Sequence, residues 1–197
     1  KTLHTSIKMK TFFATVAVWA QITLLIQGAA LNAIPRTEEL LFEEEFNSLN
    51  PDIWQHDITL GGSGNGEFEY YWNNRSTSYC EDGNLYITPG FTADVVGESY
   101  LTTYGSQIDV NGAYKFAHCT DPTNYGCMRV VSQYTPTLNP ITSARIRTQN
   151  SFTFNTGRIE MVAKLPIGDW LWPAFWLMPK SFAFGNWPAS GEIDIME

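Results

Sequence analysis

The sequence predicts an all-β fold, an antiparallel sandwich or barrel of which the jelly roll is one form. Short segments of alternating apolar residues are separated by Gly, Pro and Asn turns, and no helical period of comparable length runs through residues 34–197. Aromatic residues make up 14% of the chain and charged residues only 16%. These features are typical of a β-rich globular protein, and 197 residues suffice for one domain with a sizeable core.

Four segments carry the strand pattern most clearly. An Asp82-Gly83 pair predicts a hairpin turn before one of them, and residues 114–139 look like a polar, irregular surface insertion. In the last strand we expect four side chains to point inward, namely Ile159, Met161, Ala163 and Leu165. The strands are expected at residues 40–47, 85–88, 143–148 and 158–165.

Residues 9–33 have the pattern of a secretory signal peptide. A lysine follows Met9, an uncharged apolar run comes next, and small residues suited to cleavage follow at Gly28, Ala29, Ala30 and Ala33. We therefore expect residues 1–8 to be translated upstream sequence and the folded domain to occupy residues 34–197.

A transmembrane helix is the alternative for the same apolar run. The run is short for a span, and Gln21 and Gln27 interrupt it. The pattern therefore favours a secreted, extracellular protein without a membrane span.

The charge distribution argues against a nucleic-acid partner. Three of the 12 Lys and Arg residues precede Ile34 and no acid does, so the rest of the chain carries 20 acidic residues against a minority of basic ones. The glycine-rich residues 61–66 lack the spacing and the lysine of a phosphate-binding loop, and the acidic, aromatic residues 67–72 follow. We expect a flexible loop at the mouth of a groove.

Cysteine usage points to one local disulfide. Cys119 and Cys127 bracket a turn-rich segment, and closing so small a loop stabilises by roughly 2–3 kcal/mol in the chain-entropy account. Cys80 is then unpaired, buried, or paired beyond Glu197. No Cys/His spacing resembles a zinc site, so no metal is expected from this pattern. The sequon at Asn74 predicts N-glycosylation.

The last six residues interleave three carboxylates with apolar side chains. In a regular strand Glu192 and Asp194 share a face with Met196, and Glu197 points away from it. A β-bulge at Ile195 and Met196 would return Glu197 to the face of the other acids. The sequence therefore predicts a bulged strand that presents three carboxylates together.

This arrangement suits glycoside hydrolysis. The two glutamates would lie roughly 13 Å apart between Cα atoms, and their side chains can lean toward the roughly 5–5.5 Å carboxyl separation of a retaining enzyme; an inverting pair stays open. An acidic strand on a solvated face is the alternative interpretation. The four Trp residues just upstream favour a site, because indole rings stack on sugars.

Among these tryptophans we assign sugar contact to Trp187 and Trp176. Trp172 is a third candidate for substrate binding, although it and Trp170 could instead belong to the core.

Several motifs together resemble glycoside hydrolase family 16, most closely its animal β-1,3-glucanases and β-1,3-glucan-binding proteins. The resemblance spans nearly all of residues 34–197 and is most specific at the end of the chain. It is carried by Phe42 to Phe46, Gly66 to Tyr71, Asp82 to Ile87, Ser143 to Thr148, Trp172 to Trp176 and Trp187 to Glu197.

The resemblance implies a β-jelly-roll sandwich with a glucan on its concave face. It implies Glu192 as nucleophile, Glu197 as acid and base, and Asp194 as the carboxylate that tunes both, acting on a β-1,3-linked substrate. No cofactor is implied apart from a possible structural calcium of unknown ligands. Because the pattern stops at Glu197, we expect an incomplete jelly roll, the N-terminal part of the family domain, with no separate N-terminal glucan-binding module.

Two functions remain open at this point. One is a secreted retaining endo-β-1,3-glucanase. The other is a non-hydrolytic protein that binds β-1,3-glucan and acts with immune-cascade proteins in invertebrate pattern recognition. A secreted sandwich without a sugar site is a third, structural alternative.

Overall fold

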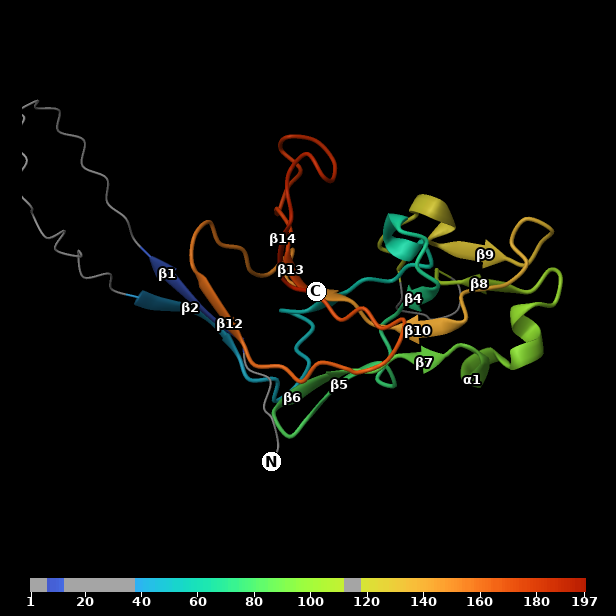
Figure 1. Ribbon diagram of the computed structural model, residues 1–197, viewed down its shortest axis with the longest axis horizontal. Coiled ribbons are helices and arrows are strands. Elements are labelled where there is room, and N and C mark those ends of the chain that lie inside the picture. Colours follow the sequence, from blue (N-terminus) through green and yellow to red (C-terminus); the bar gives the residue numbers. More distant parts are fainter. Residues whose placement is uncertain (1–6, 13–37, 112–117) are drawn as a thin grey trace, which may run out of the picture. The chain divides into compact units, whose positions relative to one another are not determined.

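The computed structural model describes residues 7–12, 38–111 and 118–197, and strands far outnumber helical turns among its regular elements (Figure 1). The predicted all-β class is thus confirmed. The strands are β1 (Ile7–Phe12), β2 (Glu38–Glu44), β3 (Gln55–His56), β4 (Glu69–Tyr71), β5 (Ser78–Glu81), β6 (Asn84–Ile87), β7 (Gly90–Phe91), β8 (Gln107–Asp109), β9 (Met128–Val130), β10 (Ile141–Ser143), β11 (Ile146–Arg147), β12 (Arg158–Met161), β13 (Phe175–Leu177) and β14 (Ile193–Met196). The helical turns are α1 (Ala93–Val96), η1 (Gly62–Gly64), η2 (Glu98–Leu101) and η3 (Thr123–Tyr125).

The described residues form two compact units. One contains β1, β2 and β12, and the other runs from Phe46 to Thr153 and from Leu165 to Glu197. The first unit is an antiparallel sheet of order β12-β1-β2. Its middle strand covers the start of the predicted leader, and the remainder of that leader lies outside the described residues.

Two predicted strands end earlier in the structure than the alternation suggested. Strand β2 ends at Glu44, and Phe46 beyond it adopts a left-handed φ of 50°. Strand β12 ends at Met161, and both Ala163 and Leu165 are exposed, which corrects their predicted inward placement. Alternation predicts which face a side chain takes within a strand, but it does not predict where pairing with a neighbour stops.

In the second unit, the predicted hairpin turn is present between β5 and β6. Asp82 and Gly83 take φ values of 49° and 71°, as a two-residue turn with two left-handed residues requires. The Asn84 amide donates to the Asp82 carbonyl over 2.9 Å and closes the turn.

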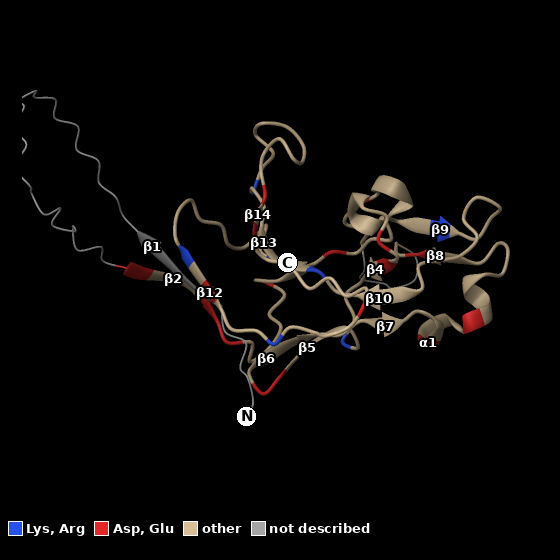
Figure 2. Ribbon diagram, viewed as in Figure 1, with Lys and Arg blue, Asp and Glu red and all other residues tan. Residues whose placement is uncertain are grey.

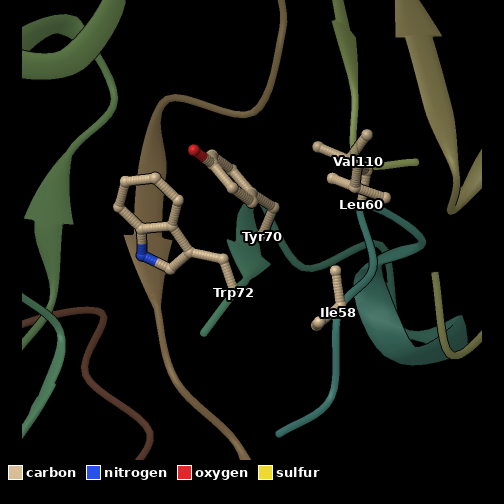
Figure 3. Packing of buried hydrophobic residues seen from close by; sticks show 5 residues of the cluster. All are labelled: Ile58, Leu60, Tyr70, Trp72 and Val110. Atoms are coloured by element: carbon tan, nitrogen blue, oxygen red, sulfur yellow. The ribbon is translucent and has the colours of Figure 1, made fainter. Parts of the chain in front are cut away.

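The core of the second unit gathers side chains from three separate segments. Figure 3 shows the Tyr70 and Trp72 rings from β4 and its C-terminal side beside Ile58, Leu60 and Val110. The two rings meet edge to face with centroids 5.5 Å apart. The side-chain amide of Asn139 donates hydrogen bonds to the backbone carbonyls of Leu60 and Glu69. It therefore links Asn139 to the segments that form this core.

Two further expectations are corrected in this unit. The pairing is not wholly antiparallel, because β10 runs parallel to β4 while it pairs antiparallel with β7. Residues 114–117 of the predicted insertion lie outside the described residues. Residues 118–139 are not merely a surface insertion, since β9 pairs with β8 while Val131 and Leu138 are buried. Because most residues of the segment are polar, its composition did not indicate that Val131 and Leu138 would be buried.

Candidate active site

The predicted bulge is present in the strand that carries the acids. In the pairing of β13 with β14, Trp176 lies opposite Asp194 and Phe175 lies opposite Met196, so one step on β13 corresponds to two steps on β14. Ile195 is therefore the extra residue, and the register shifts at this point.

The bulge has a direct consequence for the carboxylates. Glu192 immediately precedes β14, Asp194 lies within it, and Glu197 follows it; all three are exposed. With one residue bulged out, strand alternation assigns Glu197 to the face of Glu192 and Asp194. These acids belong to one short, exposed strand of a two-stranded sheet (Figure 1).

Trp187 contacts the first of these acids. Its indole Nε1 donates a hydrogen bond to Oε2 of Glu192 over 2.5 Å. A hydrogen bond from the indole N–H fixes the orientation of the carboxylate. An oriented carboxylate is what a nucleophile requires.

The loop before β14 positions this tryptophan. The Ser190 hydroxyl donates to the Gly185 carbonyl over 2.6 Å and accepts from the Phe184 amide over 3.1 Å. Gly185 and Gly191 both have left-handed φ values, 115° and 88°, and the Trp187-Pro188 peptide is cis. The loop is thus closed on itself by contacts of Ser190.

The aromatic candidates differ in accessibility. Trp187 and Trp172 are 61% and 57% exposed, whereas Trp176 is partly buried opposite Asp194. Trp170 is 89% exposed, so neither Trp170 nor Trp172 belongs to the core of the described residues, which corrects that alternative. The rings of Trp172 and Trp187 are accessible for stacking on a sugar.

A second polar cluster, which the sequence analysis did not identify as a unit, lies on and before β4. The Tyr71 hydroxyl is 3.1 Å from Oε2 of Glu67 and 2.8 Å from Oε1 of Glu69. Figure 2 shows the acidic character of β4. The three residues are spaced by two along an extended segment, so period-two alternation was the signal that could have revealed them.

The two carboxyl groups of this cluster have opposite pKa shifts. Burial raises the pKa of Glu69, and its contact with Glu67 raises it further. Burial would also raise the pKa of Glu67, but hydrogen bonds from Glu69, Asn65 and Tyr71 outweigh that effect. The net result is a lowered pKa of Glu67. Burial and then the two carboxylates raise the pKa of Tyr71. Of the two carboxyl groups, Glu69 therefore has the higher pKa.

Arg145 connects this cluster to the glycine-rich loop. Its guanidinium lies 4.8 Å from the centre of the Tyr71 ring, and its Nε is 2.5 Å from Oδ2 of the buried Asp57. The same side chain donates through Nη1 to the Ser63 hydroxyl over 2.5 Å. Because Ser63 lies in η1, the expected flexible loop is attached to the core through Arg145.

The remaining predicted positions are placed as follows. Cys119 and Cys127 form the predicted disulfide, with Cα atoms 5.3 Å apart, and Cys80 lies half-buried on β5 outside that bond. Asn74 occupies a turn in which its Oδ1 accepts from the Ser76 amide over 2.8 Å, and its glycosylation stays a prediction. Among the residues that the structure describes, no three His, Cys, Asp or Glu side chains are grouped to hold a metal ion.

Residues 104–197 match the model of the XgeA-like catalytic domain of glycoside hydrolase family 16. Through these residues the chain is similar to the catalytic domain of glycoside hydrolase family 16. The match contains the disulfide loop and the whole acid-bearing hairpin of the chain.

Curated relatives that are similar to this chain include both binding proteins and enzymes. A β-1,3-glucan-binding protein of Penaeus monodon is 45% identical over 90% of this chain and 50% of its own length. A glucan endo-1,3-β-glucosidase A1 of Niallia circulans is 31% identical over 80% of this chain and 20% of its own. A glucan endo-1,3-β-glucosidase of Cryptopygus antarcticus is 32% identical over 79% of this chain and 44% of its own length.

The chain thus spans half or less of the length of these relatives. No solved structure matches it. In the part of the chain that the structure describes, no helix has the length and apolar character needed to cross a membrane.

Proposed function

We propose that this chain carries the catalytic acids of a secreted, retaining endo-β-1,3-glucanase. The observation that carries the proposal is the bulged β14, whose register assigns Glu192, Asp194 and Glu197 to one face. The hydrogen bond from Trp187 to Glu192 and the two endo-1,3-β-glucosidase relatives support it.

The proposed reaction is a double displacement. Glu192 attacks the anomeric carbon while Glu197 donates its proton to the departing glycosidic oxygen, so a glycosyl ester forms as the C–O bond breaks. Glu197 then removes a proton from water, the water oxygen attacks the same carbon, and Glu192 leaves. Asp194 lies between the two glutamates in sequence and is the third acid of the proposed site.

Substrate recognition is assigned to the accessible tryptophans. Trp172 and Trp187 expose their indole rings, and Trp176 lies opposite Asp194 across the hairpin. Flat apolar rings bind the faces of glucose units, and hydroxyl groups take up the polar contacts. A neutral β-1,3-glucan fits this aromatic and acidic surface.

A non-hydrolytic recognition protein is the second candidate. It is favoured by the β-1,3-glucan-binding protein of Penaeus monodon, which is 45% identical over most of this chain. In that case the same surface binds β-1,3-glucan without turnover, and the bound protein signals to immune-cascade partners.

The test measures reducing ends released from soluble β-1,3-glucan by the full-length protein and its Glu192→Gln variant. We expect turnover by the unmutated protein, first-formed product in the β configuration by NMR, and loss of turnover with retained binding in Glu192→Gln. A Glu81→Gln variant, altered at an exposed acid of β5, serves as the control. Binding without product by the unmutated protein would establish the recognition function instead.

A further inference from the structure

A cavity of about 540 Å³ lies in the second unit, away from the acids of β14 in sequence. Its polar lining consists of Gln55, His56, Asn73, Arg75 and His118. Ligand sites commonly enclose roughly 300–1,000 Å³, so this volume suits a small organic molecule.

The lining is unusual for so acidic a chain. The protein has 20 acidic residues against 12 basic ones, yet among the residues that the structure describes no Asp or Glu lines the cavity. Arg75 supplies a permanent positive charge there, and His118 adds a ring N–H donor. Asp57, which follows His56 in sequence, has both Arg145 and Arg147 against its carboxylate.

Arg75 is held at the cavity by neutral partners. Its Nη2 donates to Oδ1 of Asn73 and lies 3.4 Å from Nε2 of His56. In the described part of the chain Arg75 forms no ion pair, in contrast to the two arginines on Asp57. A guanidinium with neutral partners retains its charge for an incoming anion.

His56 supports this arrangement without competing for the anion. Its Nε2 is 2.8 Å from the Ser78 hydroxyl, and Ser78 is fully buried. Burial and then the charge of Arg75 lower the pKa of His56 to about 4. The ring is therefore neutral near pH 7 and can accept a hydrogen bond from Arg75.

The rest of the lining is apolar. Trp54 and Ile58 are both buried and contribute to the wall, and Leu49 and Pro51 extend it. A bare inorganic ion would leave these side chains uncovered, whereas an organic body would cover them.

We propose that this cavity binds an oxyanion, a carboxylate, sulfate or phosphate group carried on a small organic molecule, with Arg75 as its principal contact. The Gln55 and Asn73 amides and His118 complete the set of hydrogen-bond donors. This site is separate from the proposed glucan surface in both its residues and its ligand chemistry.

Calorimetry on the full chain at pH 7 and low salt tests the proposal with three probes. Glucuronate is the organic oxyanion, glucose is its uncharged counterpart, and sodium sulfate is the free oxyanion. We expect saturable binding of glucuronate, weaker binding of sulfate and none of glucose. Failure of both anions to bind would overturn the proposal, and tighter binding of sulfate would overturn its organic part.

Variants assign the binding to this cavity. Arg75→Gln keeps a polar side chain but removes the charge, and it should weaken glucuronate binding by about tenfold or more. Lys180→Gln removes the same charge from an exposed position outside the cavity and should leave binding unchanged. Equal losses in the two variants would overturn the assignment.

Circular dichroism establishes that Arg75→Gln is folded. His118→Asn changes a second lining side chain, which is exposed. We expect it to weaken glucuronate binding less than Arg75→Gln does. Unchanged glucuronate affinity in both cavity variants would also overturn the proposal.

Discussion

At the scale of single residues, the hydrogen bond from Trp187 to Glu192 combines two roles in one side chain. The indole N–H orients the carboxylate, and the ring, 61% exposed, presents a face for a sugar. These roles can be separated, because phenylalanine retains an aromatic face and lacks the N–H donor.

We expect Trp187→Phe to lower the turnover of β-1,3-glucan by about 10- to 100-fold while glucan affinity changes little, since a hydrogen bond to a charged group contributes roughly 1.5–3 kcal/mol. Steady-state kinetics and equilibrium binding measure the two effects separately. Trp187→Ala should reduce both. The same Trp-to-Phe change at the exposed Trp170 is the control, and undiminished turnover in Trp187→Phe would contradict the orienting role.

At the scale of elements, the disulfide loop is attached closely to the core. The Leu60 amide donates to the Gly126 carbonyl over 2.7 Å, and the Thr59 hydroxyl donates to the Asp121 carbonyl over 2.9 Å. Gly126 has no room for a side chain, because a Cβ there would lie 2.2 Å from the Asp121 carbonyl oxygen and 2.3 Å from the Thr59 hydroxyl oxygen.

Gly126→Ala should therefore lower the free energy of unfolding by about 1–3 kcal/mol or more, because backbone must move to admit the methyl group. Urea unfolding measures the change. Gly64→Ala is the matched control: nothing lies within 4 Å of its Cβ position, so only its positive φ of 82° opposes the change, at a cost of about 1–2 kcal/mol. A smaller loss at Gly126 than at Gly64 would show that the loop accommodates a Cβ.

A second element, the segment from Glu67 to Tyr71, illustrates how polar residues gather through a strand. Alternation places Glu67, Glu69 and Tyr71 on one side, and Arg145 approaches from a segment more than seventy residues later. The first part of this cluster follows from local spacing. Its link to Arg145 depends on tertiary contacts that no local pattern contains.

At the scale of the whole molecule, net charge separates the two proposed ligands. The formal charge is −8 at pH 7, which disfavours binding of phosphate-rich partners and of free anions. An anion can therefore bind only where the local charge is positive. A β-1,3-glucan is uncharged, and its binding to aromatic rings does not depend on this field.

Raising sodium chloride from about 50 to about 500 mM should therefore leave glucan affinity unchanged and weaken glucuronate binding several-fold, since salt screens charge–charge attraction. Titrations of both ligands at the two salt concentrations provide the comparison. A parallel salt dependence of both affinities would contradict the assignment of the ligands to two chemically different sites.

Much of the candidate site could be predicted from local pattern. The number of residues between Glu192 and Glu197 required one bulged residue to bring the acids to one face, and the register at Ile195 confirms it. Asp82-Gly83 likewise specified its turn, and the short spacing of Cys119 and Cys127 specified their disulfide. Each of these features depends on residues close together in the chain, so its geometry follows from local backbone rules.

Other features depended on which segments meet. The parallel pairing of β4 with β10, the early end of β12, the buried anchors in residues 114–139 and the exposure of Trp170 could not be predicted from local pattern. The sequence alone determined an all-β chain with three acids in one bulged strand, because periodicity and turn residues act locally. Tertiary structure alone decided that Trp187 contacts Glu192, that Arg145 joins Asp57 and Ser63, and that Arg75 lines an acid-free cavity, because these contacts arise only when separate segments pack together.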